Sequence, residues 1–433
     1  MTNNDIVQRS ERVTPGGIHS QRRQTSQPLA IVRAKGAHVW DSTGKQYIDF
    51  QAAYGAIVLG HADPGVIARV KQGLESVDLV GMGVTPAEVE LSERLVAEVP
   101  CFEQVLLCNS GTETTLHAVR LARGVTGRQR VIKFQGGYHG SHDYLLSNTF
   151  PPVIQKGSDA DPDRAGVLPA ATEATLVCRY NDLESVRLVA EKYRGEICAV
   201  FVEPYAHNLG GAAPEPGFLE GLRKITTEIG ALLVFDEVIT GIRHGLGGYQ
   251  AIAGVTPDVA TFAKALGNGL PIGAVGGKRE YMKHFNTDVS GDVQYSGTFN
   301  GGGGPVAAAL ATIDALSDGS AYKRMTSLGA RMREGLETVC RDAGVVAHIG
   351  GFGGIFHTFF GAGPIRNQED NARQDVELYT EFRRQMLING VLDSPAAPPM
   401  RSHVSASHTE ADIDNALELA RKSLKSALQT LRR

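Results

Sequence analysis

The chain has 433 residues, of which 42% are hydrophobic and 21% charged, and its formal net charge is −4. This length exceeds one compact core, so we expect more than one lobe of an ordinary soluble globular protein. The slight negative charge argues against nucleic acid or an anionic membrane as a main partner, and no apolar run reaches membrane-spanning length.

The N-terminus lacks the basic and then apolar pattern of a signal peptide, so a cytoplasmic location is expected. The five cysteines include no C-x-x-C pair. They are expected to be reduced core thiols rather than disulfides or metal ligands, and no metal site is predicted.

Residues 1–60 are predicted to form an N-terminal arm and part of a small domain, with short strands near 30–33, 38–40 and 47–50. Between residues 61 and 310, short apolar runs alternate with amphipathic stretches. Strands are expected at 104–108, 130–134, 175–178, 199–203 and 231–237, and helices at 114–125, 181–193 and 217–229. This alternation predicts a large α/β domain with a mainly parallel sheet covered on both faces.

Residues 311–433 are predicted to form a smaller α+β domain. Helical patterns at 306–315 and 325–343 precede expected strands at 345–349 and 355–360, and the chain ends in an expected helix at 410–431. The stretch 141–169 contains several Pro and Gly residues and is predicted to be a loop.

Two residues stand out: an acid that closes an expected strand, and a lysine that opens a Gly-rich turn. Asp236 closes the apolar run from residue 231, and Lys264 comes 28 residues later at the start of a Gly-rich turn. Pyridoxal phosphate needs an acid against its ring nitrogen and a lysine that binds its aldehyde as an imine. Ligands of parallel sheets bind at the carboxyl ends of the strands, where Asp236 is expected.

A third motif is Ser110-Gly111-Thr112, between an expected strand and an expected helix. Its backbone N–H groups and hydroxyls would stabilise a phosphate at the helix N-terminus. Each motif alone is weak, because a buried Asp is commonly an ion-pair partner and Ser-Gly-Thr is commonly a turn. Their joint order and spacing favour a pyridoxal 5′-phosphate site.

These motifs carry a family resemblance. The segments 235–243 (FDEVITGIR), 263–271 (AKALGNGLP) and 110–113 (SGTE) resemble class III (omega-type) pyridoxal-phosphate aminotransferases. Segments 15–17 (PGG), 136–140 (GGYHG) and 405–409 (SASHT) are similar to the glutamate-1-semialdehyde aminomutase-like branch. The resemblance extends from about residue 10 to the C-terminus and implies fold type I.

The resemblance implies roles around the cofactor. Lys264 would form the imine and move protons, and Asp236 would pair with the ring nitrogen. Val238 and Tyr138 would cover the two ring faces, Glu203 would support the site, and Asn208 would lie near the phenolic oxygen. Thr298 would reach the phosphate from a neighbouring subunit, which implies a homodimer with shared active sites. The segment 301–304 (GGGG) departs from the family's usual Gly-Asn-Pro. His139 and His142 are interpreted as mainly structural.

On the substrate side the chain departs from the aminomutase. Arg23 matches the arginine that binds a substrate carboxylate in that branch, and Tyr54 stands where the aminomutase has a tryptophan. Met400 takes the position of the carboxylate that receives the substrate's amino end, and no acid lies between residues 394 and 408. Arg401 follows instead, as an arginine does in this stretch of similar enzymes acting on D-phenylglycine or β-amino acids. A surface position for Arg23 or Arg401 remains an alternative.

The resulting hypothesis is an aminotransferase that uses a carboxylate-bearing amino donor and a 2-oxo acid acceptor. A hydrophobic or aromatic D- or β-amino acid is one candidate donor. The alternatives are glutamate-1-semialdehyde 2,1-aminomutase, an amino-acid racemase or epimerase of the same fold, and a non-enzymatic module that only binds the cofactor.

Overall fold

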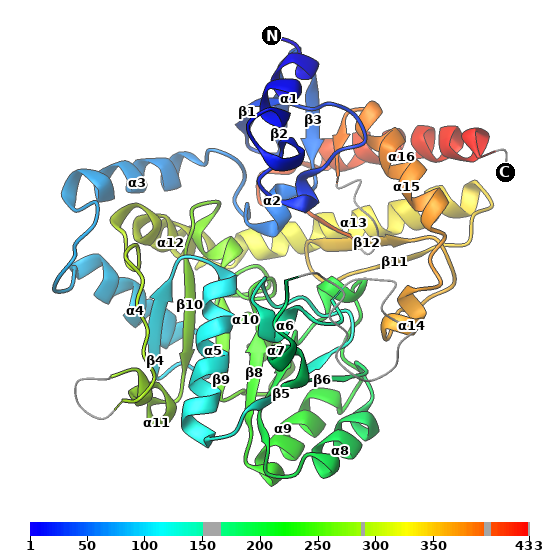
Figure 1. The fold of residues 1–433 in the computed structure, drawn as a ribbon. Helices are drawn as coiled ribbons and strands as arrows, with labels where there is room; N and C mark the ends of the chain where they lie inside the picture. Colours follow the sequence, from blue (N-terminus) through cyan, green and yellow to red (C-terminus); the bar gives the residue numbers. More distant parts are fainter. Residues whose placement is uncertain (150–165, 287–290, 394–399, 432–433) are drawn as a thin grey trace. The chain divides into compact units, whose positions relative to one another are not determined.

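The computed structural model describes residues 1–149, 166–286, 291–393 and 400–431. Two compact units are present (Figure 1). Unit 1 comprises Met1–Pro64, Gly319–Ile365 and Arg373–Arg433, and unit 2 comprises Gly65–Asp318 and Arg366–Ala372. Part of the predicted loop at 141–169, residues 150–165, lies outside the described residues. The rest contains the short helix α6 (Asp143–Leu146), and α7 (Pro169–Glu173) begins at its last residue.

Unit 2 is built on a seven-stranded sheet in the described part of the chain. The strand order is β4-β10-β9-β8-β7-β5-β6. The bounds are β4 (Gln104–Cys108), β5 (Arg130–Phe134), β6 (Thr175–Cys178), β7 (Ile197–Val202), β8 (Leu232–Asp236), β9 (Val259–Phe262) and β10 (Gly273–Gly277). Within this sheet β10 runs in one direction and the other six strands run in the opposite direction. The predicted mainly parallel sheet is confirmed.

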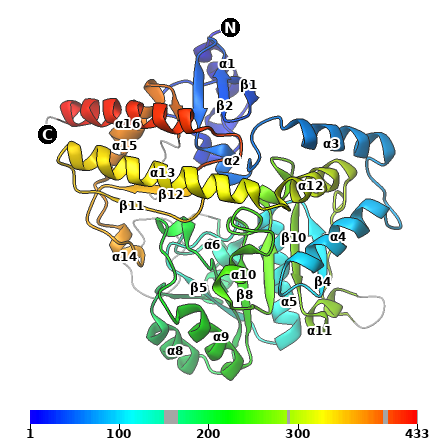
Figure 2. The ribbon, with the colours of Figure 1, turned by 180° about the vertical axis from the view of Figure 1, so that it is seen from behind.

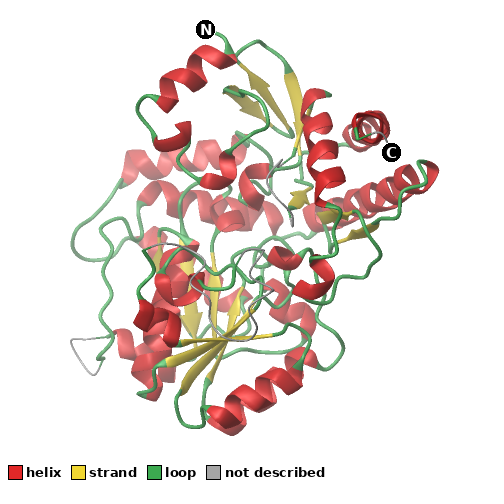
Figure 3. Ribbon diagram, turned by 45° about the vertical axis from the view of Figure 1, so that its right-hand side comes forward, coloured by secondary structure: helices red, strands yellow, loops and turns green. Residues whose placement is uncertain are grey.

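Helices pack on this sheet because its strands are apolar on both faces. β7 and β8 are buried along their whole length. α5 contacts β9 and β10, and α9 contacts β7 and β8. Figure 2 shows α8 and α9 side by side, and Figure 3 shows the strands among the helices. The longer helices are α3 (Pro64–Ser76), α4 (Pro86–Glu98), α5 (Gly111–Thr126), α8 (Leu183–Lys192), α9 (Phe218–Ile229) and α12 (Gly303–Leu316). The shorter ones are α10 (Gly248–Ala253), α11 (Arg279–Met282) and α14 (Gln368–Asn371).

Unit 1 contains two smaller sheets and is of the expected α+β type. One has the order β1-β2-β3-β13, with β1 (Ile31–Lys35), β2 (His38–Asp41), β3 (Gln46–Asp49) and β13 (Val391–Leu392). The other has the order β11-β12-β14, with β11 (His348–Gly350), β12 (Ile355–Phe359) and β14 (Arg401–His403). The helices are α1 (Asn3–Glu11), α2 (Ala52–Gly55), α13 (Ser320–Asp342), α15 (Val376–Ile388) and α16 (Glu410–Thr430).

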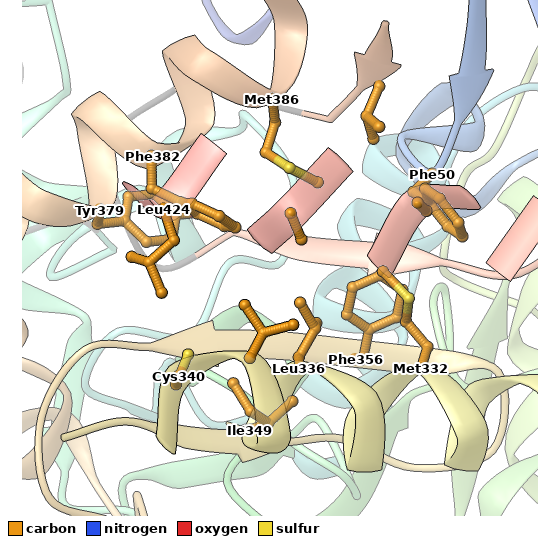
Figure 4. Packing of buried hydrophobic residues seen from close by; sticks show 14 of the residues in the cluster. Phe50, Met332, Leu336, Cys340, Ile349, Phe356, Tyr379, Phe382, Met386 and Leu424 are labelled. Carbon is orange, nitrogen blue, oxygen red and sulfur yellow. The ribbon is translucent and has the colours of Figure 1, made fainter. Parts of the chain in front are cut away.

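The core of unit 1 forms where α13, α15 and α16 meet β12. Met332, Leu336 and Cys340 of α13 belong to one buried cluster with Phe356 of β12 (Figure 4). Burying a side chain of this size contributes roughly 1.5–3 kcal/mol, so the cluster is a main source of stabilisation where these elements meet. No described helix of either unit is long and apolar enough to cross a membrane.

Candidate active site

The predicted acid and lysine follow two neighbouring strands of unit 2. Asp236, the last residue of β8, pairs in register with Thr261 of β9. Lys264 follows three residues after Thr261 and begins a short 3-10 helix, Lys264–Gly267. The N–H of Glu237 donates to the carbonyl of Thr261 at 2.9 Å, which fixes the two strand ends against each other. Asp236 and Lys264 therefore share one edge of the sheet.

Asp236 is a buried carboxylate held by three donors. Its Oδ2 accepts from Nδ1 of His139 at 2.7 Å, and its Oδ1 accepts from the N–H of Val238 at 3.0 Å and the hydroxyl of Thr261 at 3.3 Å. Burial alone would raise its pKa, but the hydrogen bond and charge of His139, the Val238 N–H and the charge of Lys264 lower the pKa below its usual value. Asp236 is therefore ionised.

The neighbouring acid has a different function. Glu237 accepts from the backbone N–H groups of Tyr249 and Gln250 at 2.5 and 3.0 Å and from the Thr240 hydroxyl at 2.8 Å. Burial raises its pKa, and these hydrogen bonds oppose the rise. Successive strand residues point to opposite sides, so the two acids cannot serve the same site. Glu237 caps the start of α10, and Asp236 remains as the candidate site residue.

Ser110, Gly111 and Thr112, which we call the phosphate cup, lie at the start of α5. Ser110 is the N-cap of this helix, and Gly111 is its first residue. N–H groups in a first helical turn have no intrahelical acceptor, so they can bind an anion. A Cβ at Gly111 would lie 2.8 Å from a methyl group of Val238 and 3.6 Å from Ala263. The phosphate cup therefore lies directly beside Val238 and the residue preceding Lys264.

Four predicted site residues keep accessible surface within otherwise buried segments. Tyr138, Asn208, Val238 and Lys264 are each half-buried, while both sequence neighbours of each one are buried. Lys264 also has a φ of +45°, an unfavourable value for a residue with a Cβ. Backbone strain of this kind commonly marks functional sites. The pattern is what a surface facing a bound ligand requires.

Glu203 follows β7 and orients Asn208. Its Oε2 accepts from the backbone N–H of Asn208 at 3.2 Å and from the side-chain amide at 3.1 Å. The same amide lies 3.4 Å from the carbonyl of Tyr138. Glu203 thus links the segment after β7 to the segment after β5, where Tyr138 lies.

Thr298 lies on an exposed loop of unit 2. Asn300, two residues later, accepts from the side-chain amide of Asn109 at 2.8 Å. Asn109 immediately precedes the phosphate cup, so the loop is anchored beside it. The predicted contact of Thr298 with a phosphate in a neighbouring subunit stays a prediction.

The predicted substrate residues all belong to unit 1. Arg22 donates to the sulfur of Met400 at 3.4 Å, and the Tyr54 hydroxyl donates to the carbonyl of Arg22. Arg23 is exposed, whereas Arg22 is half-buried and Met400 is buried. Arg401 is buried in β14, opposite His357 of β12. Of the two adjacent arginines, the structure groups Arg22 with Tyr54 and Met400; a role in substrate binding stays a prediction.

Two residues beside Asp236 did not feature as cofactor-site residues in the sequence. His139 was interpreted as mainly structural, yet its ring is bonded to Asp236, 97 positions away. For Thr261 the sequence alone gives no indication. Its position beside Asp236 depends on the pairing of β8 with β9, and the sequence does not predict a strand at β9.

Comparisons with known proteins show which family and fold the chain shares. The family model for aminotransferase class-III matches residues 19–424. A glutamate-1-semialdehyde 2,1-aminomutase of Desulfitobacterium hafniense is 38% identical over 422 residues, covering 96% of each chain. One from Thermomicrobium roseum is 39% identical over 417 residues, covering 95% of each chain.

Two solved structures are also similar. An omega-transaminase from Sphaerobacter thermophilus has a TM-score of 0.92 at 32% identity, covering 98% of this chain and 97% of its own. A β-phenylalanine aminotransferase from Variovorax paradoxus has a TM-score of 0.86 at 30% identity, covering 98% and 94%. The predicted fold type I is confirmed.

Proposed function

We infer the reaction from one premise: the chain belongs to the class-III aminotransferase family, and its cofactor is pyridoxal 5′-phosphate. We propose that it moves an amino group between a carboxylate-bearing amino compound and a 2-oxo acid. The observation that carries this proposal is the shared sheet edge at which Asp236, Lys264 and the phosphate cup follow β8, β9 and β4.

The hydrogen-bonding groups of Asp236 and of the phosphate cup fit this cofactor. An ionised carboxylate offers about four acceptor positions, and the three donors on Asp236 leave one for a protonated ring nitrogen. The N–H groups and hydroxyls of the phosphate cup suit a phosphate, and the absence of a Cβ at Gly111 allows close approach. Val238 and Tyr138 are the residues that would cover the ring, and Asn208 the one that would approach its phenolic oxygen.

Bound pyridoxal phosphate supplies an electron-accepting ring that stabilises negative charge on the substrate carbon. Asp236 holds the proton on the ring nitrogen, because its carboxylate is ionised and desolvated. Lys264 would hold the aldehyde of the cofactor, and its Nζ would accept and return the proton that moves in the reaction. Glu203 keeps Asn208 oriented during both half-reactions.

The proposed donor carries a carboxylate and a hydrophobic or aromatic side chain. Arg22 and Arg401 are the candidate carboxylate ligands, because a guanidinium binds carboxylates through two parallel hydrogen bonds. Tyr54 and Met400 would supply the apolar contacts. The similar Variovorax enzyme is a β-phenylalanine aminotransferase, which supports testing β-amino acids first.

The names of the 38–39% identical relatives favour a second candidate, glutamate-1-semialdehyde 2,1-aminomutase. The residues of unit 1 between positions 393 and 400 do not suit this second candidate. Met400 stands where the aminomutase carries a carboxylate, and residues 394–399 contain no acid. Asp393, the nearest acid upstream, pairs with Arg383 and accepts from the hydroxyl of Ser402 at 2.7 Å. An acid engaged in this way is poorly suited to receive a substrate amine.

We also propose a homodimer. Unit 2 exposes large apolar side chains on two segments, with Met82 92% and Phe299 66% exposed. The two segments are joined, because the N–H of Gly303 donates to the carbonyl of Asp78 at 2.8 Å. An exposed apolar surface that continues to the anchored Thr298 loop suits a second copy of this chain. Light scattering of purified protein tests this; a monomer that is fully active would refute it.

The reaction is tested by incubating purified enzyme with β-phenylalanine, D-phenylglycine and α-amino acids, each with 2-oxoglutarate or pyruvate. Formation of a keto product from a carboxylated donor supports the proposal, and its absence with every donor contradicts it. Formation of 5-aminolevulinate from glutamate-1-semialdehyde without an acceptor would establish the aminomutase instead. Lys264→Ala should abolish activity, whereas Lys278→Ala is the control, because Lys278 pairs with Asp258 at 3.4 Å.

A further inference from the structure

Thr115 connects three parts of the proposed site. It lies on α5, one turn after the phosphate cup, and is 1% exposed. Its hydroxyl is 2.6 Å from the carbonyl of His139 and 3.2 Å from Nε2 of His142. It is also 3.1 Å from the carbonyls of Gly111 and Thr112. One buried hydroxyl therefore contacts the phosphate cup and the segment that contains His139.

The direction of these hydrogen bonds follows from counting protons. A hydroxyl has a single proton to donate, and the His139 carbonyl is its nearest acceptor. Thr115 must then accept from His142, so His142 carries its proton on Nε2. The other ring nitrogen of His142 agrees, because Nδ1 is buried without a hydrogen-bond partner in the described part of the chain. A proton on Nδ1 would have no acceptor there.

This order of bonds continues to Asp236. His139 is held at two points, since its carbonyl accepts from Thr115 and its Nδ1 donates to Asp236 at 2.7 Å. A second hydrogen bond joins the same two segments, because the N–H of Ser141 donates to the hydroxyl of Thr112 at 3.3 Å. A Cβ at Gly140 would lie only 2.9 Å from Cα of Thr112, so the two segments are in close contact.

We propose that Thr115, oriented by His142, is a positioning residue that holds His139 against Asp236 and so aligns the ring-nitrogen end of the cofactor site with its phosphate end. This inference rests on the proposed function, because it assumes that Asp236 and the phosphate cup hold the two ends of pyridoxal phosphate. Thr115 and His142 do not themselves contact the substrate.

The test compares variants that differ by one hydroxyl. Thr115→Val removes the hydroxyl and keeps the shape, and Thr115→Ser restores it. Thr114→Val is the matched control, because the buried Thr114 hydroxyl donates to the carbonyl of Gly111 at 2.8 Å and, among the described residues, forms no hydrogen bond with His139. His142→Gln retains an N–H that can donate to Thr115, and His142→Phe does not.

Each protein is measured for its pyridoxal-phosphate dissociation constant and for the pH titration of the bound cofactor's absorbance band. We expect Thr115→Val and His142→Phe to weaken cofactor binding about tenfold, the loss that one buried hydrogen bond predicts, and to shift the titration. Thr115→Ser, His142→Gln and Thr114→Val should stay close to the wild type. Equal effects of Thr114→Val and Thr115→Val, or a change in thermal stability alone, would overturn the inference. Transamination by the wild type is assayed separately, so failure here leaves the proposed function standing.

Discussion

Gly111→Ala should weaken cofactor binding without destabilising the fold. The new Cβ would lie 2.8 and 3.1 Å from the two methyl groups of Val238. Apolar carbon atoms normally lie roughly 3.5–4.0 Å apart, so Val238 must move by about 1 Å. Overpacking of this size costs ~1–3 kcal/mol.

This cost should appear mainly in the bound state. Val238 is half-buried and is proposed to cover one ring face, so it can move into the space that the cofactor occupies. The backbone at Gly111 is not left-handed, and Ala is a good residue in a helix. The apo protein therefore tolerates the change, while the dissociation constant of pyridoxal phosphate should rise about 5- to 150-fold.

The assay is reconstitution of apo protein with pyridoxal phosphate, followed by absorbance, beside urea unfolding of the apo form. Gly127→Ala is the control. It lies at the other end of α5 with a φ of +68° and no atom near its Cβ. It should cost ~1 kcal/mol of stability and leave the dissociation constant unchanged. Unchanged cofactor affinity in Gly111→Ala would refute the reasoning.

Three further predictions concern unit 1. Arg22→Gln should raise the KM of a carboxylated donor about tenfold and Arg23→Gln less than threefold, because only Arg22 adjoins Met400; equal effects would contradict this. Ala53→Gly should raise the free energy of unfolding by about 0.5–1 kcal/mol, since residues 52–54 all have positive φ. The gain would appear as a higher urea midpoint, and a lower midpoint would argue against backbone strain. Burial lowers the pKa of His408 to about 4, below its ordinary 6.5. The contribution of the neutral His408 ring to the free energy of unfolding is therefore complete above pH 6.5 and is lost toward pH 4, at up to ~1.4 kcal/mol per pH unit. Denaturation at several pH values should show a smaller loss of stability for His408→Asn.

The cofactor side of the site could be predicted because it depends on local sequence. An apolar strand that ends in Asp236 and a lysine that opens a Gly-rich turn each have a readable pattern. The pattern fails where a strand lacks side chains, since three of the five residues of β10 are glycine. It also fails for His139, because the partner that gives it a function is distant in sequence and adjacent only through the pairing of strands.

The substrate side could be predicted only in outline, for a similar reason. The family motif points to Arg23, but the sequence alone gives no reason to prefer it to the adjacent Arg22. The structure separates them through a contact between residues 22 and 400, which spans 378 positions of the chain. Burial and hydrogen bonding therefore add Arg22 as a candidate beside Arg23, and substrate binding by either arginine stays a prediction.

This difference explains why relatives with different names share one fold. The cofactor side is fixed by strand register in unit 2, where a change at Asp236 or Gly111 disturbs several bonded neighbours at once. The candidate substrate residues lie on short segments of unit 1, where Met400, at the position matched to the aminomutase's carboxylate, is buried immediately before β14. We therefore expect the type of reaction to depend on a few such positions of unit 1, with Lys264 and Asp236 serving the cofactor in either case. Specificity in this chain is accordingly best tested by exchanging charges at positions 22, 400 and 401, with Asp236 and Lys264 unchanged.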